Sequence, residues 1–440
     1  MKDFDLNKIK KVHFVGIGGI GVSAIARMML LERNPPAGGV SGSDTSASLI
    51  TDELQKLGAK IFFGHNAKNV GEDVDLLVYT PAVNFDNPEL KKAERIGIPS
   101  LSYPEMLGLI SKDKFTIAVS GAHGKTTTTA MIGKILIDAG LDPSIVVGSF
   151  LKDQGSNFVA GRGKYFVCEA CEYKKSFLNL NPKIIIITNI DNDHLDYYKN
   201  LANIKKAFGE FASKLGASDY LICDQSDKNL KEVVKKAKCK IMDYSLMTFK
   251  FNLKIPGQHN IKNAQAAMAA AKILGVSPST SLAALNNFSG TWRRFEYKGR
   301  TQNGVLVYDD YGHHPTEIKA TLKGAREFFG PPAGRQKIWC VFQPHLYSRT
   351  KLLLNDFGKS FENADFVVVA DIYAAREKKD NGINSKMVAE KIIKSGGRAV
   401  YKDSFGKIAD FLRKKAKKGD MVIPIGAGDI FKVGEMLLKK

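Results

Sequence analysis

The sequence predicts an α/β fold, because short aliphatic stretches run repeatedly into a glycine-rich turn and then into a helical pattern. Three such runs occur, and they begin near residues 12, 115 and 299. Parallel sheets flanked by helices have this alternation. The length of 440 residues agrees with it, since at roughly 150 residues per domain the chain is long enough for about three domains.

The first run predicts a strand at residues 12–15, a glycine turn at 16–21 and a helix that continues through 28–31. A second strand is expected at residues 76–79. This unit is expected to end near residue 110.

The second run predicts a strand at residues 115–119, a turn at 120–124 and an apolar helix at 128–139. Further along this unit, two strands and an Ala-rich buried helix are expected at residues 166–168, 184–187 and 260–274. The third run starts near Gly299, and its short apolar strands are expected at residues 305–308, 339–342, 366–369 and 421–425. Boundaries near residues 110 and 293 therefore divide the chain into predicted domains 1–110, 111–293 and 294–440.

The charge balance favours anionic partners. Lysine and arginine number 65 against 45 aspartate and glutamate residues, so the formal net charge is +20. Charge alone does not choose between nucleic acid, anionic lipid and phosphorylated small molecules. No stretch approaches the ~18 apolar residues of a membrane helix. Residues 1–11 lack the apolar core of a secretory signal, so we expect a cytoplasmic protein whose five cysteines are reduced, and a basic run at 413–418 that is a solvated helix end.

The strongest single motif is Ser-Gly-Ala-His-Gly-Lys-Thr-Thr-Thr-Thr at residues 120–129, directly after a predicted strand and before a predicted helix. Backbone N–H groups in such a turn, together with the positive end of the helix, form a cradle for phosphate. Lys125 adds a mobile cation, and Thr126 offers a hydroxyl to Mg²⁺. The spacing is shorter than in the usual phosphate loop, and a glycine-rich turn without nucleotide is the alternative.

The N-terminal glycine turn resembles a dinucleotide-binding fingerprint, since Asp44 follows it by a little over twenty residues. In that fingerprint a pyrophosphate lies on a helix N-terminus and the acid holds a ribose hydroxyl. By itself the turn leaves three possibilities open, namely NAD or FAD, another nucleotide diphosphate, and an unoccupied structural turn.

A third cluster joins Cys-Glu-Ala-Cys-Glu at residues 168–172 to Thr-Asn-Ile-Asp-Asn-Asp-His-Leu-Asp at 188–196. A zinc or redox role for Cys168 and Cys171 is disfavoured, because no second cysteine pair lies at zinc-site spacing. Glu169 at a strand end could supply an oxygen ligand to Mg²⁺. His194 lies among three aspartates, so a ligand role and a structural role are both open.

The last cluster consists of residues 309–317 and 342–350, which both follow predicted strands. Open α/β sheets bind ligands at this position. Helix capping and turn formation explain the residues at 315–317. They do not explain all of four further polar side chains, His313, His314, His345 and Arg349.

The motifs of the chain, taken in order, resemble those of the Mur ligases. They are G-x-G-G-x-G, G-A-H-G-K-T-T-T-T, E-A-C-E-Y, T-N-I-D-N-D-H-L-D, G-Q-H-N-I-K-N, R-R-F-E, D-D-Y-G-H-H-P-T-E, F-Q-P-H-x-Y-S-R-T and G-A-G-D-I. The resemblance spans Gly16 to Ile430, and it is strongest to the members that act on UDP-N-acetylmuramate and L-alanine in peptidoglycan precursor synthesis. It implies that ATP phosphorylates the muramate carboxylate and that the alanine amine attacks the acyl phosphate, which yields an amide, ADP and phosphate. It also implies a Rossmann-like N-terminal domain, a central phosphate-loop ATPase-like sheet and a Rossmann-like C-terminal domain that binds the amino acid and closes over ATP.

Carried over by position, the resemblance implies four groups of ligands. The ATP-binding residues would be Gly121, Ala122, His123, Gly124, Lys125, Thr126, Thr127, His259, Asn260, Asn263, Arg294 and Asp309. The UDP-sugar-binding residues would be Gly16, Gly18, Gly19, Gly21, Ser23, Asp44 and Thr80. The amino acid would bind at Tyr311, His313, His345 and Arg349, and Mg²⁺ at Thr126, Glu169 and His194. The catalytic residues would be Lys125, Glu169, His194, His345 and Arg349.

Two departures from the family pattern stand out. The family often has Glu-Ala-Asp-Glu-Ser where this chain has Glu-Ala-Cys-Glu-Tyr, and it often has Arg where this chain has Leu346. A related ligase that attaches a preformed tripeptide to UDP-N-acetylmuramate is the alternative enzyme. A nucleic-acid-binding NTPase is disfavoured, because the chain has no recognised RNA or DNA module. We therefore expect small-molecule substrates, no nucleic acid or membrane partner, and a monomer or homodimer.

Overall fold

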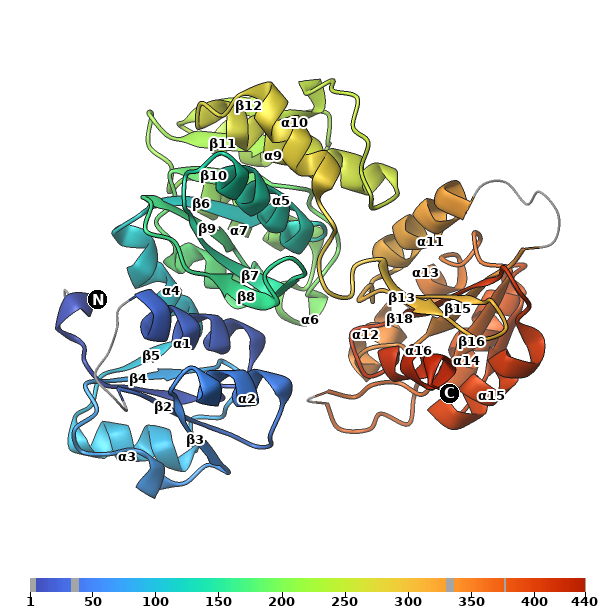
Figure 1. The fold of residues 1–440 in the computed structure, drawn as a ribbon, viewed down its shortest axis with the longest axis horizontal. Coiled ribbons are helices and arrows are strands. Elements are labelled where there is room, and N and C mark those ends of the chain that lie inside the picture. The colour runs from blue at the N-terminus through green and yellow to red at the C-terminus, as the bar shows by residue number, and fades with distance from the viewer. Residues whose placement is uncertain (1–4, 33–38, 330–335, 376, 440) are drawn as a thin grey trace. The chain divides into compact units, whose positions relative to one another are not determined.

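The computed structural model describes residues 5–32, 39–329, 336–375 and 377–439. It contains three sheets, each flanked by helices (Figure 1). The chain forms two compact units, of which the first consists of Met1–Asn252 and Lys262–Phe288 and the second of Leu253–Ile261 and Ser289–Lys440. The first unit holds two of the sheets and the second unit holds the third. The predicted three-domain α/β fold is confirmed, whereas its predicted boundaries stay a prediction.

The first sheet is parallel and has the strand order β3-β2-β1-β4-β5. Its central strand is entirely buried, and its four residues Val-His-Phe-Val pair with β2 on one side and β4 on the other. The strands are β1 (Val12–Val15), β2 (Val40–Asp44), β3 (Lys60–Phe63), β4 (Leu76–Tyr79) and β5 (Ser100–Ser102). The helices are α1 (Ile20–Glu32), α2 (Leu49–Lys56), α3 (Pro88–Ile96) and α4 (Tyr103–Lys112).

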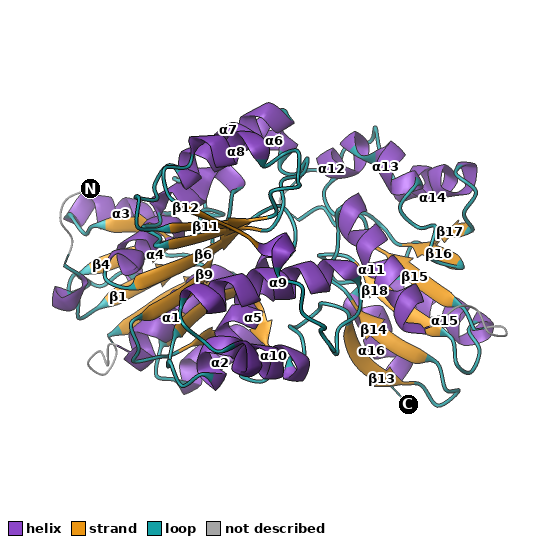
Figure 2. Cartoon of the chain, turned by 90° about the horizontal axis from the view of Figure 1, so that it is seen from above, coloured by secondary structure: helices purple, strands orange, loops and turns teal. Residues whose placement is uncertain are grey.

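The second sheet has the strand order β12-β11-β10-β6-β9-β7-β8, with only β8 antiparallel to its neighbour. Helices α5 and α10 lie together on one face and α7 and α8 on the other (Figure 2). The strands are β6 (Phe115–Ser120), β7 (Ser144–Leu151), β8 (Ser156–Val159), β9 (Tyr165–Glu169), β10 (Ile184–Ile187), β11 (Tyr220–Cys223) and β12 (Lys240–Asp243). The helices are α5 (Lys125–Asp138), α6 (Leu195–Tyr198), α7 (Leu201–Ala212), α8 (Lys231–Lys236), α9 (Gln258–Ile273) and α10 (Pro278–Asn287).

The third sheet has the strand order β13-β14-β18-β15-β16-β17, in which the edge strand β13 is antiparallel. Apolar side chains form one core on each of its faces. The strands are β13 (Glu296–Arg300), β14 (Leu306–Asp309), β15 (Ile338–Phe342), β16 (Phe366–Val369), β17 (Ala399–Tyr401) and β18 (Met421–Ile425). The helices are α11 (Pro315–Phe329), α12 (Tyr347–Leu352), α13 (Leu354–Gly358), α14 (Ser385–Lys394), α15 (Phe405–Lys415) and α16 (Phe431–Leu438).

The topology of the second sheet determines where the polar loops meet. Strand β6 lies between β10 and β9, and all three are parallel. The loops that follow Ser120, Glu169 and Ile187 therefore leave the sheet at the same edge. Across the described parts of the chain, no helix has the length and apolarity needed to span a bilayer.

Candidate active site

The loop after β6 depends on two glycines. Gly121 has φ of 131° and Gly124 has φ of 86°, which are left-handed values that L side chains rarely adopt. A Cβ atom on Gly121 would lie 2.1 Å from Thr188 Oγ1, and one on Gly124 would lie 2.5 Å from Asn263 Oδ1. Gly124 is also the N-cap of α5 and offers no capping side chain. The N–H groups of the first turn of α5 are thus directed at a position suited to an anion.

The shape of this loop is determined by Asn189, which lies in the loop after β10. The backbone N–H of Ala122 donates to the Asn189 carbonyl at 3.1 Å, and that of His123 donates to Asn189 Oδ1 at 3.0 Å. Asn189 Nδ2 in turn donates to the His123 carbonyl at 2.9 Å. The His123 imidazole pairs with Asp191, with 3.0 Å between Nε2 and Oδ2. The conformation of the predicted phosphate loop is therefore held by hydrogen bonds to the loop that follows β10.

Lys125 lies at the first position of α5, where its ammonium donates to Glu172 Oε1 at 2.9 Å and to the carbonyls of Gly121 and Ala122. Burial by itself would lower the pKa of Lys125, but the neighbouring acidic groups, Glu172 foremost, together outweigh burial and raise the pKa above its ordinary value. Burial would likewise raise the pKa of Glu172, but the Lys125 ammonium and the neighbouring His194 lower it overall. Both members of the pair are therefore charged at neutral pH.

The acid nearest to His194 is Glu172, with 3.6 Å between its Oε1 and His194 Nε2. Glu172, Asp193 and His194 can each offer one ligand atom, and these atoms lie within 4.8 Å of one another. Glu172 Oε2 is buried and has no hydrogen-bond partner among the described residues. Glu169 is not a member of this cluster, and its predicted role as a Mg²⁺ ligand stays a prediction. The motif Glu-Ala-Cys-Glu holds both acids, and the sequence analysis named only Glu169 as a ligand, so the contact of Glu172 with His194 was missed.

Glu169 instead faces a cavity of about 330 Å³ in the first unit, where its Oε1 accepts the N–H of Gly148 at 2.6 Å. The cavity joins two predicted sites, because the glycine turn of the first sheet forms part of its wall and the end of β9 forms another part. Its lining residues are Gly19, Ile20, Gly21, Val22, Thr80, Tyr103, Pro104, Leu107, Lys125, Gly148, Glu169, Ala170, Cys171, Ser176, Phe177 and Leu180.

Two glycines of the N-terminal turn allow close approaches to the cavity wall. A Cβ atom on Gly16, whose φ is 76°, would lie 2.5 Å from Thr80 Cγ2. A Cβ atom on Gly21 would lie 2.8 Å from the ring of Tyr103. The turn can therefore present its backbone to the cavity only because these side chains are absent.

Asp44 braces the same turn. Its Oδ2 accepts the N–H of Gly18 at 2.8 Å, and its Oδ1 accepts the N–H of Thr45 at 2.7 Å. Ser23 is fully buried, and its hydroxyl accepts from Asn157 Nδ2 at 2.8 Å. Ser23 does not line the cavity, and a ligand role for either Asp44 or Ser23 stays a prediction.

Helix α9 carries three residues predicted to bind ATP, His259, Asn260 and Asn263. Asn263 is buried beside Gly124, as the short distance to a Cβ atom there shows. Asn260 is also buried, and its Nδ2 donates to the carbonyl of Pro256 at 2.6 Å. The His259 ring packs against Gly257.

The second unit brings together the four residues predicted to bind the amino acid. The ring centroids of Tyr311 and His313 are 5.6 Å apart, as are those of His313 and His345. Arg349 Nη1 lies 3.1 Å from His345 Nδ1. A guanidinium can only donate, so Nδ1 is the acceptor and the imidazole carries its proton on Nε2. Tyr373, which sequence reasoning missed, stacks on His345 with 5.8 Å between the ring centroids.

Asp309 forms a buried ion pair with Arg293, with 2.8 Å between Oδ2 and Nε. Burial raises the pKa of Asp309 to about 6, although Arg293 opposes the shift. The Arg293 guanidinium also donates to the carbonyls of Gly426 and Gly428, at 2.6 and 3.0 Å. The predicted ATP ligand Arg294 lies over the Tyr311 ring at 5.4 Å. The anchoring role of Arg293 could not be assigned from the R-R-F-E motif, in which both arginines look alike.

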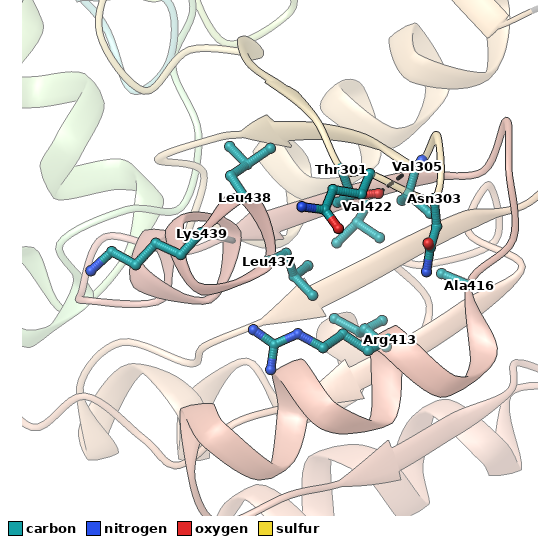
Figure 3. A pocket seen from close by; sticks show the side chains of 11 residues that line it. Thr301, Asn303, Val305, Arg413, Ala416, Val422, Leu437, Leu438 and Lys439 are labelled. Carbon is teal, nitrogen blue, oxygen red and sulfur yellow. Dashed lines mark hydrogen bonds between the residues drawn. The ribbon is translucent and has the colours of Figure 1, made fainter.

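A second cavity, of about 340 Å³, lies in the second unit between the β13–β14 turn and the ends of α15 and α16 (Figure 3). Leucine and valine side chains form much of its wall, and Arg413 at its edge donates to the Met436 carbonyl. None of the predicted site residues lines this cavity. The cavity of the first unit is therefore the candidate active site.

Three family models match the chain. The Mur ligase family catalytic domain matches residues 11–115, the Mur ligase middle domain matches 119–250, and the Mur ligase glutamate ligase domain matches 293–428. The chain belongs to the Mur ligase family.

Within this family, its sequence is 44% identical to the UDP-N-acetylmuramate–L-alanine ligase of Acetivibrio thermocellus, over 99% of this chain and 97% of that protein. It is also 44% identical to the enzyme of the same name from Clostridium tetani, over 99% and 100% of the two chains. Among solved structures, the UDP-N-acetylmuramate–alanine ligase of Thermotoga maritima matches with a TM-score of 0.80 and 29% identity, over 97% of this chain and 98% of that chain. The murein peptide ligase of Psychrobacter arcticus shares the fold, with a TM-score of 0.71 at 24% identity over 98% of each chain.

Proposed function

We propose that this chain uses ATP to join L-alanine to the carboxylate of UDP-N-acetylmuramate, in the synthesis of peptidoglycan precursors. The observation that carries the proposal is the cavity of the first unit, whose wall includes both the N-terminal glycine turn and Lys125. A nucleotide-sugar held at the turn would thus have its acid group near the phosphate loop. The names of the relatives with 44% identity support the choice of L-alanine.

Lys125 and the N–H groups of the first turn of α5 would hold the phosphates of ATP. The ammonium and the N–H dipoles are already in position before ATP binds, so the site needs little reorganisation during phosphoryl transfer. The walls formed by Tyr103, Leu107 and Phe177 would limit the access of water to the acyl phosphate.

The residues of the site fit a divalent cation. Thr126, Glu169, Glu172 and His194 would hold it. The buried Glu172 Oε2, which has no hydrogen-bond partner within the described part of the chain, suits a positive ligand. When bound, the cation would reduce the repulsion between the transferring phosphoryl group and the sugar carboxylate.

Arg349 would hold the carboxylate of L-alanine. Its contact with His345 Nδ1 orients the guanidinium and leaves the His345 proton on Nε2, so His345 would donate a hydrogen bond from that atom. Leu346 is buried, with φ of 69°, and adds no cation here. We expect alanine to be preferred over serine and glycine by only ~1 to 3 kcal/mol, since one methyl group discriminates weakly.

The proposal is tested by incubating the protein with UDP-N-acetylmuramate, ATP, Mg²⁺ and one acceptor at a time, and measuring ADP release together with the mass of the product. L-alanine should give the highest kcat/KM. A higher value with the tripeptide L-Ala-γ-D-Glu-meso-diaminopimelate would establish the alternative peptide ligase instead. ADP release that needs no UDP-N-acetylmuramate would contradict both ligase functions.

A further inference from the structure

We propose that Tyr173 is a positioning residue for the imidazole of His194. The proposal rests on the function proposed above, in which His194 serves the cation site. Tyr173 directly follows Glu172 and begins the 3-10 helix η3 (Tyr173–Asn179). Its ring centroid lies 4.7 Å from that of His194, with 40° between the ring planes. At this distance the two rings are in contact.

The hydroxyl group of Tyr173 adds a second contact to the same segment. Tyr173 Oη donates to Asp196 Oδ2 at 3.1 Å. Asp196 lies two residues after His194, in the single-turn helix α6. Tyr173 thus touches His194 with its ring and holds the following turn with its hydroxyl group.

His194 needs such support because its own element is short. It is the N-cap of a four-residue helix and has φ of 53°, an unusual value for a non-glycine residue. Its Nε2 lies 3.6 Å from Glu172 Oε1 and 3.7 Å from Asp193 Oδ2. A rotation of the imidazole would lose both contacts, and the neighbouring Tyr173 ring limits that rotation.

Tyr173 is itself held by its surroundings. The next two residues, Lys174 and Lys175, have φ of 51° and 59° and turn the chain sharply. Lys175 Nζ pairs with Glu210 Oε2 at 2.7 Å, and Ser176 Oγ donates to the Tyr173 carbonyl at 2.8 Å. The tyrosine is therefore presented to His194 by a turn that is fixed on its far side.

The test compares three variants of the full chain. Tyr173→Leu removes the ring and the hydroxyl group, Tyr173→Phe removes the hydroxyl group alone, and Tyr197→Leu changes an exposed tyrosine 6.2 Å from Tyr173 as a control. Mn²⁺ binding is followed by electron paramagnetic resonance in the presence of a non-hydrolysable ATP analogue. The Mg²⁺ dependence of kcat and the KM for L-alanine are measured alongside.

We expect Tyr173→Leu to weaken Mn²⁺ binding about 10-fold, as loss of a partner that orients a metal ligand does. Tyr173→Phe should retain most of the affinity, and Tyr197→Leu all of it. The KM for L-alanine should stay near the wild-type value in all three variants. Wild-type Mn²⁺ affinity in a folded Tyr173→Leu protein would overturn the proposal, as would an equal loss in Tyr197→Leu. If the wild type makes no alanine adduct while Tyr173→Leu still weakens Mn²⁺ binding, the proposed function fails and the positioning role stands.

Discussion

At the scale of single residues, the site depends on charges that are stable only in pairs. Lys125 and Glu172 are separated by 47 residues in the chain and contact each other at 2.9 Å. Burial penalises each charge when it is alone, so removal of one partner leaves the other uncompensated. The ion pair keeps the ammonium charged and close to the phosphate loop before a nucleotide binds.

Replacement of Lys125 by alanine should lower kcat on the order of 10³-fold, because a charge-assisted contact to the transferring phosphoryl group is lost. ADP release measures the effect. The matched control is Lys134→Ala on the same helix, which breaks only a surface pair with Asp138. The double variant Lys125→Ala/Glu172→Gln removes the uncompensated carboxylate, and circular dichroism confirms folding. Wild-type turnover in a folded Lys125→Ala protein would contradict the assignment.

A second buried carboxylate should make stability depend on pH. Glu89 is fully buried, and burial alone would raise its pKa, but the neighbouring His13 imidazole and hydrogen bonds from Ser43 and Asn69 lower the pKa to about 2. Because the folded-state pKa lies below the ordinary value of 4.5, the carboxylate stabilises the fold above about pH 4.5. This contribution, of about 3 kcal/mol, is lost as the pH falls from 4.5 towards 2.

Urea unfolding of wild type and Glu89→Gln at pH 7 and at pH 3.5 tests this prediction. Glu89→Gln should be less stable at pH 7, and the difference in unfolding free energy should shrink at pH 3.5. A difference that is the same at both pH values would show that the charge of Glu89 does not contribute.

At the scale of elements, the start of α1 has to come close to Tyr103. We expect Gly21→Ala to weaken UDP-N-acetylmuramate binding at least 10-fold, because the added Cβ would lie 2.8 Å from the Tyr103 ring in the cavity wall. The matched control is Gly406→Ala, also at the second position of a helix, where a Cβ meets nothing within 4 Å. Titration calorimetry gives the affinity, and wild type should bind neither NAD nor FAD. Tight NAD binding would contradict the interpretation of the N-terminal glycine turn as a UDP-sugar site.

The sequence predicted the elements that carry strong local signals. The buried strands β1, β6, β10 and β18 lie where aliphatic runs placed them, because burial on both faces of a parallel sheet selects such runs. The strands that were not predicted are β2, β3, β5, β7, β8, β11, β12, β13 and β17. Among them, the edge strands β13 and β17 have partly exposed residues that carry no comparable pattern.

Which charged side chains pair between distant segments could not be predicted. The contact of Glu172 with His194 depends on how β9 ends relative to the loop after β10. The pairing of Arg293 with Asp309 likewise depends on the register of β13 against β14. Composition and spacing carry no information on either.

At the scale of the whole molecule, the two compact units should respond differently to ligands. Both tryptophans of the chain, Trp292 and Trp339, belong to the second unit. The candidate active site, where UDP-N-acetylmuramate is proposed to bind, is the cavity of the first unit. A ligand stabilises the part that binds it, by about 2.7 kcal/mol at a concentration 100 times Kd. UDP-N-acetylmuramate should therefore raise the Tm seen by circular dichroism and leave the Tm seen by tryptophan fluorescence nearly unchanged. Equal shifts of both signals would show that the units unfold as one.

The bracing of the phosphate loop by Asn189 also limits how the loop could be engineered. Three hydrogen bonds link residues 122 and 123 to a side chain and a carbonyl more than 60 positions away. A graft of residues 120–126 into another scaffold would transfer the motif sequence without the Asn189 hydrogen bonds that hold its conformation. A working transplant would have to include the loop after β10 as a second, spatially adjacent insert.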